Sequence, residues 1–89
     1  MTIFEFADVI DKEIVVRYYP NQRGRFMARF DHCEITDGAI LEGAYEDGKT
    51  PDEAINKYAI RISGKRLAFN AMTNNRQEYV APHLDGKRF

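Results

Sequence analysis

Residues 47–64 read DGKTPDEAINKYAIRISG and contain the start signal, the apolar face and the stop signal of one helix. Thr50 is a suitable N-cap, Pro51 suits the first helical position, and Glu53, three residues after the cap, completes a capping box. An apolar stripe with the i, i+3, i+4, i+7 spacing of a helix is formed by Ile55, Tyr58, Ala59 and Ile62. Gly64 follows as the residue that ends the helix. We therefore expect an amphipathic helix here, against which the rest of the chain packs.

Length and composition favour one soluble domain. The chain has 89 residues, of which 44% are hydrophobic and 30% charged. Cys33 is the only cysteine, which fits a reducing compartment. No apolar run approaches the roughly 18 residues of a membrane span, and the first residues lack the pattern of a signal peptide. We expect a cytoplasmic protein without membrane contact, with one domain over residues 1–82 and a tail over residues 83–89 that frays.

The N-terminal residues predict a second, short helix followed by a strand. Thr2 and Glu5 form a capping box at the start of residues 2–10. Helical spacing of apolar residues recurs there at Ile3, Phe6, Ala7 and Ile10. Residues 13–19 are rich in β-branched and aromatic side chains, which favours a strand, and residues 20–24 form the turn after it.

A hairpin is predicted around Asp37 and Gly38, the commonest pair for a two-residue turn. Its first strand begins near Arg25. The resulting pairs are Thr36 with Ala39, Ile35 with Ile40, Glu34 with Leu41, His32 with Gly43, and Phe30 with Tyr45. This register puts on one buried face the residues Phe26, Ala28, Phe30, Leu41, Gly43 and Tyr45. A small apolar spot on the opposite face would consist of Cys33, Ile35 and Ile40.

The stretch after the main helix predicts further strands. Residues 65–71 carry Leu67, Phe69 and Ala71 at alternate positions, residues 73–75 are a turn, and residues 77–81 can pair back as a last strand. The fold class is therefore α+β: a short N-terminal helix, a three-stranded antiparallel meander, one main helix packed on the sheet, then one or two further strands. Both helices are expected to cover the apolar face of the sheet.

Acidic residues concentrate in the middle of the chain. The net charge is −1, whereas residues 31–53 hold eight acids and one base. A patch that binds a partner is predicted from six of the acids: Glu34, Glu42, Glu46, Asp47, Asp52 and Glu53. Four of them are expected to meet at the turn at Gly48: Glu46, Asp47, Asp52 and Glu53. The alternative is a solvated surface that basic neighbours balance.

A basic and aromatic stretch, RYYPNQRGRFMARF over residues 17–30, forms the second candidate surface. Alternation puts on the solvent face of the first two strands Arg17, Tyr19, Arg25, Met27 and Arg29, with Arg23 in the turn. Arginines between aromatic rings can bind single strands by phosphate contacts and stacking. The alternative is that the arginine stems cover the sheet while their charges pair with Asp31, Glu34 or Glu42.

Few residues suggest catalysis. His32 and Cys33 are adjacent, so on a strand their side chains point to opposite faces and cannot act as base and nucleophile. His83 lies in the predicted tail, and the histidines and the cysteine have no metal-ligand spacing. No glycine-rich phosphate loop is present. We expect no catalytic residue, no metal site and no cofactor.

The predicted strand order, with GKTPDEAI opening the helix at residues 48–55, resembles the small HicB-like antitoxin domains. It also resembles small phage-encoded proteins, in which a segment similar to ISGK at residues 62–65 is followed by a strand. The order of helix, three strands and helix is similar, too, to double-stranded RNA-binding domains, whose second helix begins with lysines that grip phosphate. Here that position holds Asp52 and Glu53, which would repel phosphate.

From the acidic patch and the first two resemblances we expect a small non-enzymatic protein-binding module, encoded by a phage or mobile element. It would inhibit or regulate a basic, nucleic-acid-handling enzyme of the bacterial host, as an anti-defence protein such as an anti-CRISPR or in an antitoxin-like role. One alternative is direct nucleic-acid binding through the basic stretch of residues 17–29. Another is a phage structural or assembly component. The sequence leaves the oligomeric state open.

Overall fold

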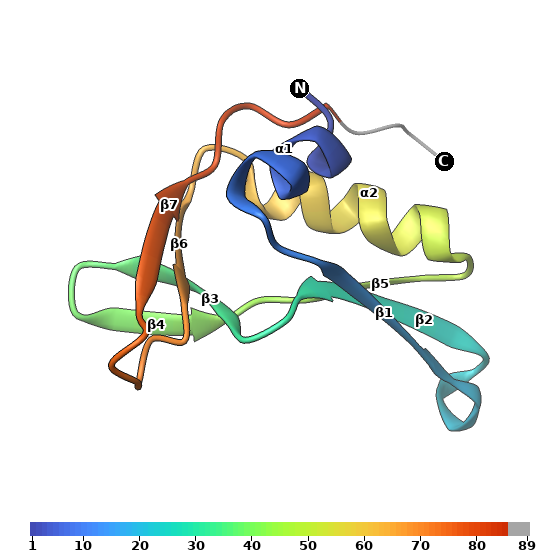
Figure 1. The fold of residues 1–89 in the computed structure, drawn as a ribbon. Coiled ribbons are helices and arrows are strands. Elements are labelled where there is room, and N and C mark those ends of the chain that lie inside the picture. Colours follow the sequence, from blue (N-terminus) through green and yellow to red (C-terminus); the bar gives the residue numbers. More distant parts are fainter. Residues whose placement is uncertain (86–89) are drawn as a thin grey trace.

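The computed structural model describes residues 1–85 of the chain, and Figure 1 shows its helices and strands. In chain order they are α1 (Ile3–Ile10), β1 (Ile14–Tyr19), the 3₁₀ turn η1 (Pro20–Gln22), β2 (Arg25–Phe30), β3 (Cys33–Asp37), β4 (Ile40–Gly43), β5 (Glu46–Gly48), α2 (Pro51–Ile62), β6 (Arg66–Phe69) and β7 (Gln77–Val80). The predicted α+β class is confirmed, including both strands after α2. The strands form two sheets, in the spatial orders β1-β2-β5 and β4-β3-β6-β7.

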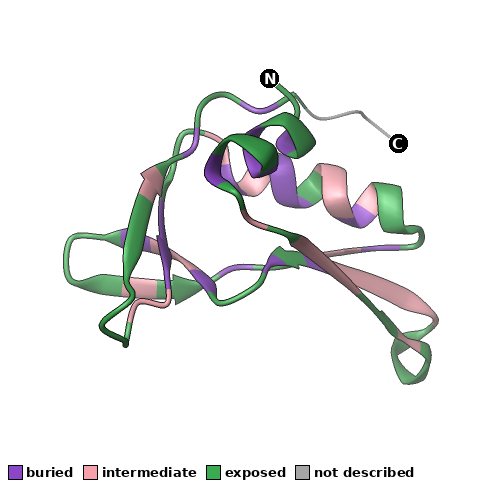
Figure 2. Ribbon diagram, viewed as in Figure 1, coloured by how far each residue is buried: buried purple, intermediate pink, exposed green. Residues whose placement is uncertain are grey.

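Both helices lie on the same side of the three-stranded sheet, as predicted (Figure 1). Buried residues gather between the helices and this sheet and continue along β6 (Figure 2). Phe30 at the end of β2 is central, because its ring meets those of Phe6, Tyr58 and Phe69 edge-on at centroid distances of 6.1, 5.9 and 5.6 Å. Such edge-to-face pairs contribute about 0.5–1.5 kcal/mol each beyond the area they bury.

The caps of both helices follow the sequence prediction closely. In α1, Thr2 Oγ1 accepts from the Glu5 N–H at 3.1 Å, and the Thr2 N–H donates to Glu5 Oε1 at 2.9 Å, which is a complete capping box. In α2, Thr50 Oγ1 likewise accepts from the Glu53 N–H at 3.1 Å. The Glu53 carboxylate, however, accepts from the N–H of Lys49 rather than that of the cap.

The buried stripe of α2 is shifted by one residue from the predicted one at its start. It consists of Ala54, Tyr58, Ala59 and Ile62, whereas Ile55 is only half-buried. The cause is the close approach of Gly48: a Cβ on that residue would lie 2.6 Å from the Ala54 nitrogen. The bare backbone of β5 therefore fits against Ala54, which turns Ile55 towards the rim of the core.

The predicted hairpin register is wrong. β3 and β4 pair Asp37 with Ile40 and Thr36 with Leu41, so the two loop residues are Gly38 and Ala39. Gly38 has a φ of +61°, and Asp37 has no positive φ. Glycine takes this conformation at little cost, so the turn forms with Gly38 as its first loop residue and Asp37 stays in the strand.

The predicted continuous second strand is also interrupted. At His32 the chain takes a φ of +53°, and β3 leaves the first sheet to pair with β6. β2 pairs instead with β5 through Ala28 and Glu46, so the expected pair of Phe30 with Tyr45 does not form. The predicted apolar spot on the opposite face changes as well. Its first member, Cys33, is buried in the core, whereas Ile40 is exposed.

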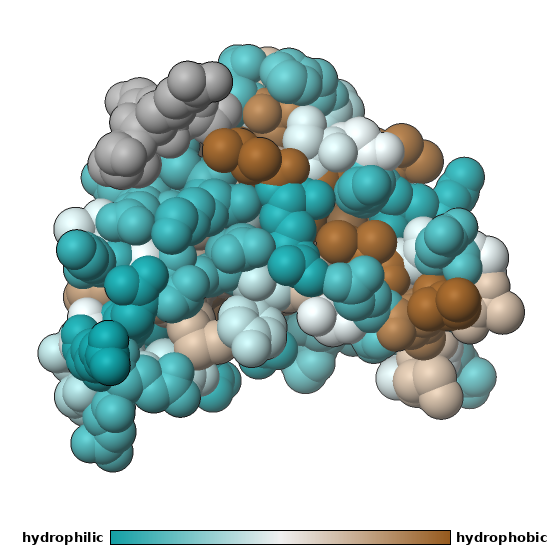
Figure 3. Space-filling view, turned by 180° about the vertical axis from the view of Figure 1, so that it is seen from behind, coloured by the Kyte–Doolittle hydropathy of each residue, from teal (hydrophilic) through white to brown (hydrophobic). Residues whose placement is uncertain are grey.

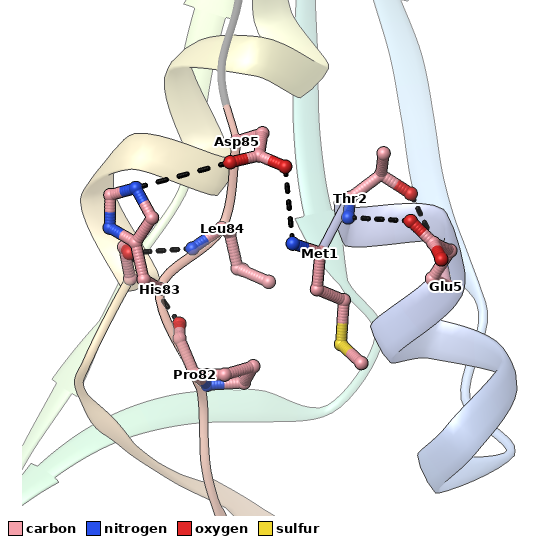
Figure 4. A network of polar contacts seen from close by, with 8 residues as sticks. Met1, Thr2, Glu5, Pro82, His83, Leu84 and Asp85 are labelled. Atoms are coloured by element: carbon pink, nitrogen blue, oxygen red, sulfur yellow. Dashed lines mark hydrogen bonds and ion pairs between the residues drawn. The ribbon is translucent and has the colours of Figure 1, made fainter.

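The two ends of the described chain are held together (Figure 4). The N-terminal ammonium group of Met1 lies 3.1 Å from Asp85 Oδ2, and the Leu84 N–H donates to Ser63 Oγ at 2.9 Å. The Leu84 side chain is buried in the core. The predicted tail thus begins with residues that contact the fold, and its remainder, residues 86–89, lies outside the described residues.

Candidate functional site

The structure does not gather the predicted acidic residues into one patch. Glu46 and Asp47 are neighbours on β5, so their side chains lie on opposite faces of the sheet. Glu46 Oε1 lies 3.2 Å from Arg61 Nη1, and Asp47 Oδ2 lies 2.6 Å from Arg25 Nε. Glu42 Oε1 also meets Arg61, at 2.5 Å. The hydrogen bond to Glu46 is the main reason that the pKa of Arg61 is raised above its ordinary value.

At the start of α2, Glu53 lies 3.3 Å from Lys57 Nζ, and the hydrogen bond from Lys57 is the main reason that the pKa of Glu53 is lowered. Within residues 1–85, Asp52 and Glu34 have no ion pair. Of the six predicted residues, four therefore have a basic partner inside the chain, on three different parts of the fold. For these four residues the structure agrees with the alternative prediction, a solvated surface on which basic neighbours pair with the acids.

The basic residues lie as predicted on the face of the three-stranded sheet that carries no helix. β1 and β2 pair Val15 with Arg29, Arg17 with Met27, and Tyr19 with Arg25, and directly opposite residues share a face. β5 adds Asp47, which lies opposite Met27, and Tyr45, just before β5, lines the same hollow as Arg17 and Arg29. We call this the open face, formed by Val15, Arg17, Tyr19, Arg25, Met27, Arg29, Tyr45 and Asp47.

The open face is hollowed along its length. A hollow of about 240 Å³ is lined by Val15, Arg17, Tyr19, Met27, Arg29 and Tyr45. A second hollow, of about 390 Å³, is lined by Arg29, His32, Cys33, Glu34, Gly43, Ala44 and Tyr45. Arg29 and Tyr45 line both hollows, so the two adjoin and form one shallow track from the β1–β2 end towards His32. Tyr45 was not among the predicted residues of this face, because the expected hairpin register places it on the buried face.

Two arginines of the open face keep their charges unpaired. Among residues 1–85, Arg17 and Arg29 take part in no ion pair, and both are exposed. The predicted alternative paired these arginines with neighbouring acids, but Asp31 meets His32 at 3.5 Å and Glu42 meets Arg61. Only Arg25 is neutralised on this face, by Asp47. Arg23 is exposed in the turn between β1 and β2, where it has a φ of +61°.

Of the potentially reactive groups, His32 is exposed at the end of this track, whereas Cys33 and Tyr58 are buried. Burial raises the pKa of the Cys33 thiol to about 12, and it also raises the pKa of Tyr58 above its ordinary value. A thiol in that state carries almost no nucleophilic thiolate at neutral pH. Within the described residues no group of three His, Cys, Asp or Glu side chains could hold a metal ion. None of the helices formed by residues 1–85 is long and apolar enough to cross a membrane.

Comparisons with protein-family models, with curated proteins and with solved structures found no match to this chain. The resemblance to HicB-like domains and to small phage proteins therefore stays a prediction from the sequence.

Proposed function

We propose that the protein binds single-stranded nucleic acid through the open face. The observation that carries this proposal is the pair of unpaired guanidinium groups, Arg17 and Arg29, beside the exposed ring of Tyr45 in one hollowed track. Phosphates would meet the two arginines, and bases would stack on Tyr45 and on Tyr19. Stacking of this kind contributes about 1–3 kcal/mol per base and tolerates any sequence.

A single strand fits this face better than a duplex. Binding to a duplex rests mainly on phosphate contacts, and two unpaired arginines offer few of them. The paired bases of a rigid duplex would also not be available to stack on the tyrosine rings. The helix start that grips duplex RNA in double-stranded RNA-binding domains carries Asp52 and Glu53 in this chain. Docking of a basic protein on the acidic residues, and a structural role in a phage, remain predictions from the sequence.

A fluorescence anisotropy titration with a labelled oligonucleotide of about 12 nucleotides tests the proposal, since single-strand sites span about 4–16 nucleotides. We expect Arg17→Glu combined with Arg29→Glu to weaken binding at least about tenfold, and the parent affinity to fall as salt is added. The matched control is Lys65→Glu combined with Arg66→Glu, which makes the same charge change beyond the C-terminal end of α2, away from the open face. We expect this control to bind nearly as well as the parent.

Equal losses in the two double variants would overturn the proposal, because net charge rather than the open face would then explain binding. Absence of binding by the folded parent protein at low salt would overturn it as well. Tighter binding of a duplex of the same length would contradict the stacking role of Tyr19 and Tyr45.

A further inference from the structure

β1 (Ile14–Tyr19) is an edge strand with unusually little protection. It pairs with β2 on one side, and no strand of residues 1–85 pairs with its other side. The other edges, β4, β5 and β7, are three or four residues long and each carries at least one acid. β1 has six residues, IVVRYY, with one charge and no proline. Proteins usually blunt such an edge with charges, proline or a bulge, because it is ready to pair with another strand.

We propose that a second copy of this chain pairs antiparallel along β1, so that two three-stranded sheets join into one. A two-fold axis perpendicular to the sheet places one residue opposite itself. Centring on Val16 pairs residues 14–18 and sets Val15 opposite Arg17 of the second copy. Centring on Arg17 would oppose two guanidinium groups, and centring on Val15 would pair only residues 14–16 of the strand. The register centred on Val16 is therefore favoured.

The exposed apolar side chains near β1 support this register. Phe4 is 57% exposed and lines a hollow together with Ile14, at the start of β1. Tyr18 is 56% exposed and lies on the same face of the strand as Ile14, against Phe26. Pairing around Val16 sets Tyr18 of the second copy opposite Ile14, next to Phe4. The exposed rings of Phe4 and Tyr18 would therefore be covered at both ends of the interface. Seen from behind, the surface carries separate apolar patches between polar side chains (Figure 3).

The pairing would also extend the open face. Because residues opposite each other share a face, the helices of both copies would lie on one side of the joined sheet and both open faces on the other. Arg17 and Arg29 of each copy would then line one surface. The pairing itself does not depend on nucleic acid, so its test needs none.

The test measures mass by light scattering during gel filtration, with folding checked by circular dichroism. We expect the parent to elute with a mass approaching twice the 10.3 kDa of one chain, increasingly so as its concentration is raised. Val15→Arg opposes a guanidinium to Arg17 of the second copy and should shift the protein to the monomer. Adding Arg17→Glu to Val15→Arg turns this repulsion into an attraction and should restore the dimer. Ile40→Arg, on the β4 edge, is the matched control and should leave the mass unchanged.

Three outcomes would overturn the proposal: a parent that is monomeric at every concentration, a dimer that Ile40→Arg disrupts as strongly as Val15→Arg, or a charge swap that fails to restore the dimer. Oxidation of Val16→Cys should also cross-link two copies, whereas cross-linking through Arg17→Cys instead would indicate the rejected register. The mass measurement reports the pairing and the oligonucleotide titration reports the open face, so the two proposals can fail independently.

Discussion

The two faces of the three-stranded sheet are made by alternate residues of the same strands, and they differ in almost every property. The covered face carries Ala28 and Phe30, both fully buried under the helices. The open face carries the intervening Arg29, which is exposed and has no ion pair within residues 1–85. One residue of displacement thus separates a side chain that holds the fold together from one that is available to a ligand.

This difference indicates that folding and binding can be changed separately. Substitutions on the covered face should alter the free energy of unfolding, whereas substitutions on the open face should alter affinity. Surface changes away from caps and buried partners usually stay within about 0.5 kcal/mol of the parent stability.

The largest effect is expected at Phe30, whose ring packs against Phe6, Tyr58 and Phe69. Phe30→Ala should lower the free energy of unfolding by about 3–5 kcal/mol, because it leaves a cavity among these rings. Urea denaturation measures the change. The neighbouring Arg29→Ala is the control and should lie within about 0.5 kcal/mol of the parent. A stability loss at Arg29 as large as that at Phe30 would break the distinction between the faces.

The next effect is expected at Gly48, where β5 approaches the start of α2. Gly48→Ala should cost about 1–3 kcal/mol by overpacking, because the new Cβ would lie 2.6 Å from the Ala54 nitrogen and 2.9 Å from the Glu53 Cβ. Gly43→Ala is a suitable control, since a Cβ there would meet nothing within 4 Å. If both variants melt at the same temperature, the close approach of β5 to α2 does not limit stability.

Most elements of the fold could be predicted, because their signals are local. The caps at Thr2 and Thr50 and the alternation in residues 25–30 need only neighbouring residues to be read. The register of the β3–β4 hairpin could not be predicted, because Asp37-Gly38 and Gly38-Ala39 are both possible two-residue loops and the choice depends on pairing with distant β6. That error also hid Tyr45.

The candidate site shows the same limit. The basic residues were found because strand alternation alone puts Arg17, Arg25 and Arg29 on one face. The acidic patch was inferred from charge along the chain, which carries no information on ion pairs across it. Arg61, on the last turn of α2, forms ion pairs with both Glu42 and Glu46, and no spacing rule connects these positions.

A smaller effect on the free energy of unfolding is expected at alkaline pH, and it comes from buried groups. The pKa of Cys33 rises from 9.0 to about 12 because the thiol is buried, so between these values the folded protein keeps a proton that the unfolded chain releases. Stability should therefore fall as pH rises through this range, by on the order of 1 kcal/mol at pH 10 from this group. Buried Tyr58, whose pKa is also raised, acts in the same direction. Urea denaturation of the parent and of Cys33→Ser at pH 7 and 10 measures the contribution, and an identical pH dependence in both proteins would contradict it.

The smallest effect is expected at Asp47, the one acid on the open face. Its carboxylate lies 2.6 Å from Arg25 Nε, and both side chains are partly exposed, so the pair contributes less than about 1 kcal/mol to stability. Asp47→Asn keeps the shape of the side chain and frees a third guanidinium beside Tyr19. If the open face binds nucleic acid, affinity should rise about two- to fivefold and its salt dependence should steepen.

Glu78→Gln makes the same charge change on β7, where it frees Arg66 and Arg76, and should leave the affinity unchanged. Affinity that rises equally in both variants would mean that only net charge matters. If Asp47→Asn instead weakened the capture of a basic protein partner and left nucleic-acid binding unaltered, the acidic residues rather than the open face would form the functional surface.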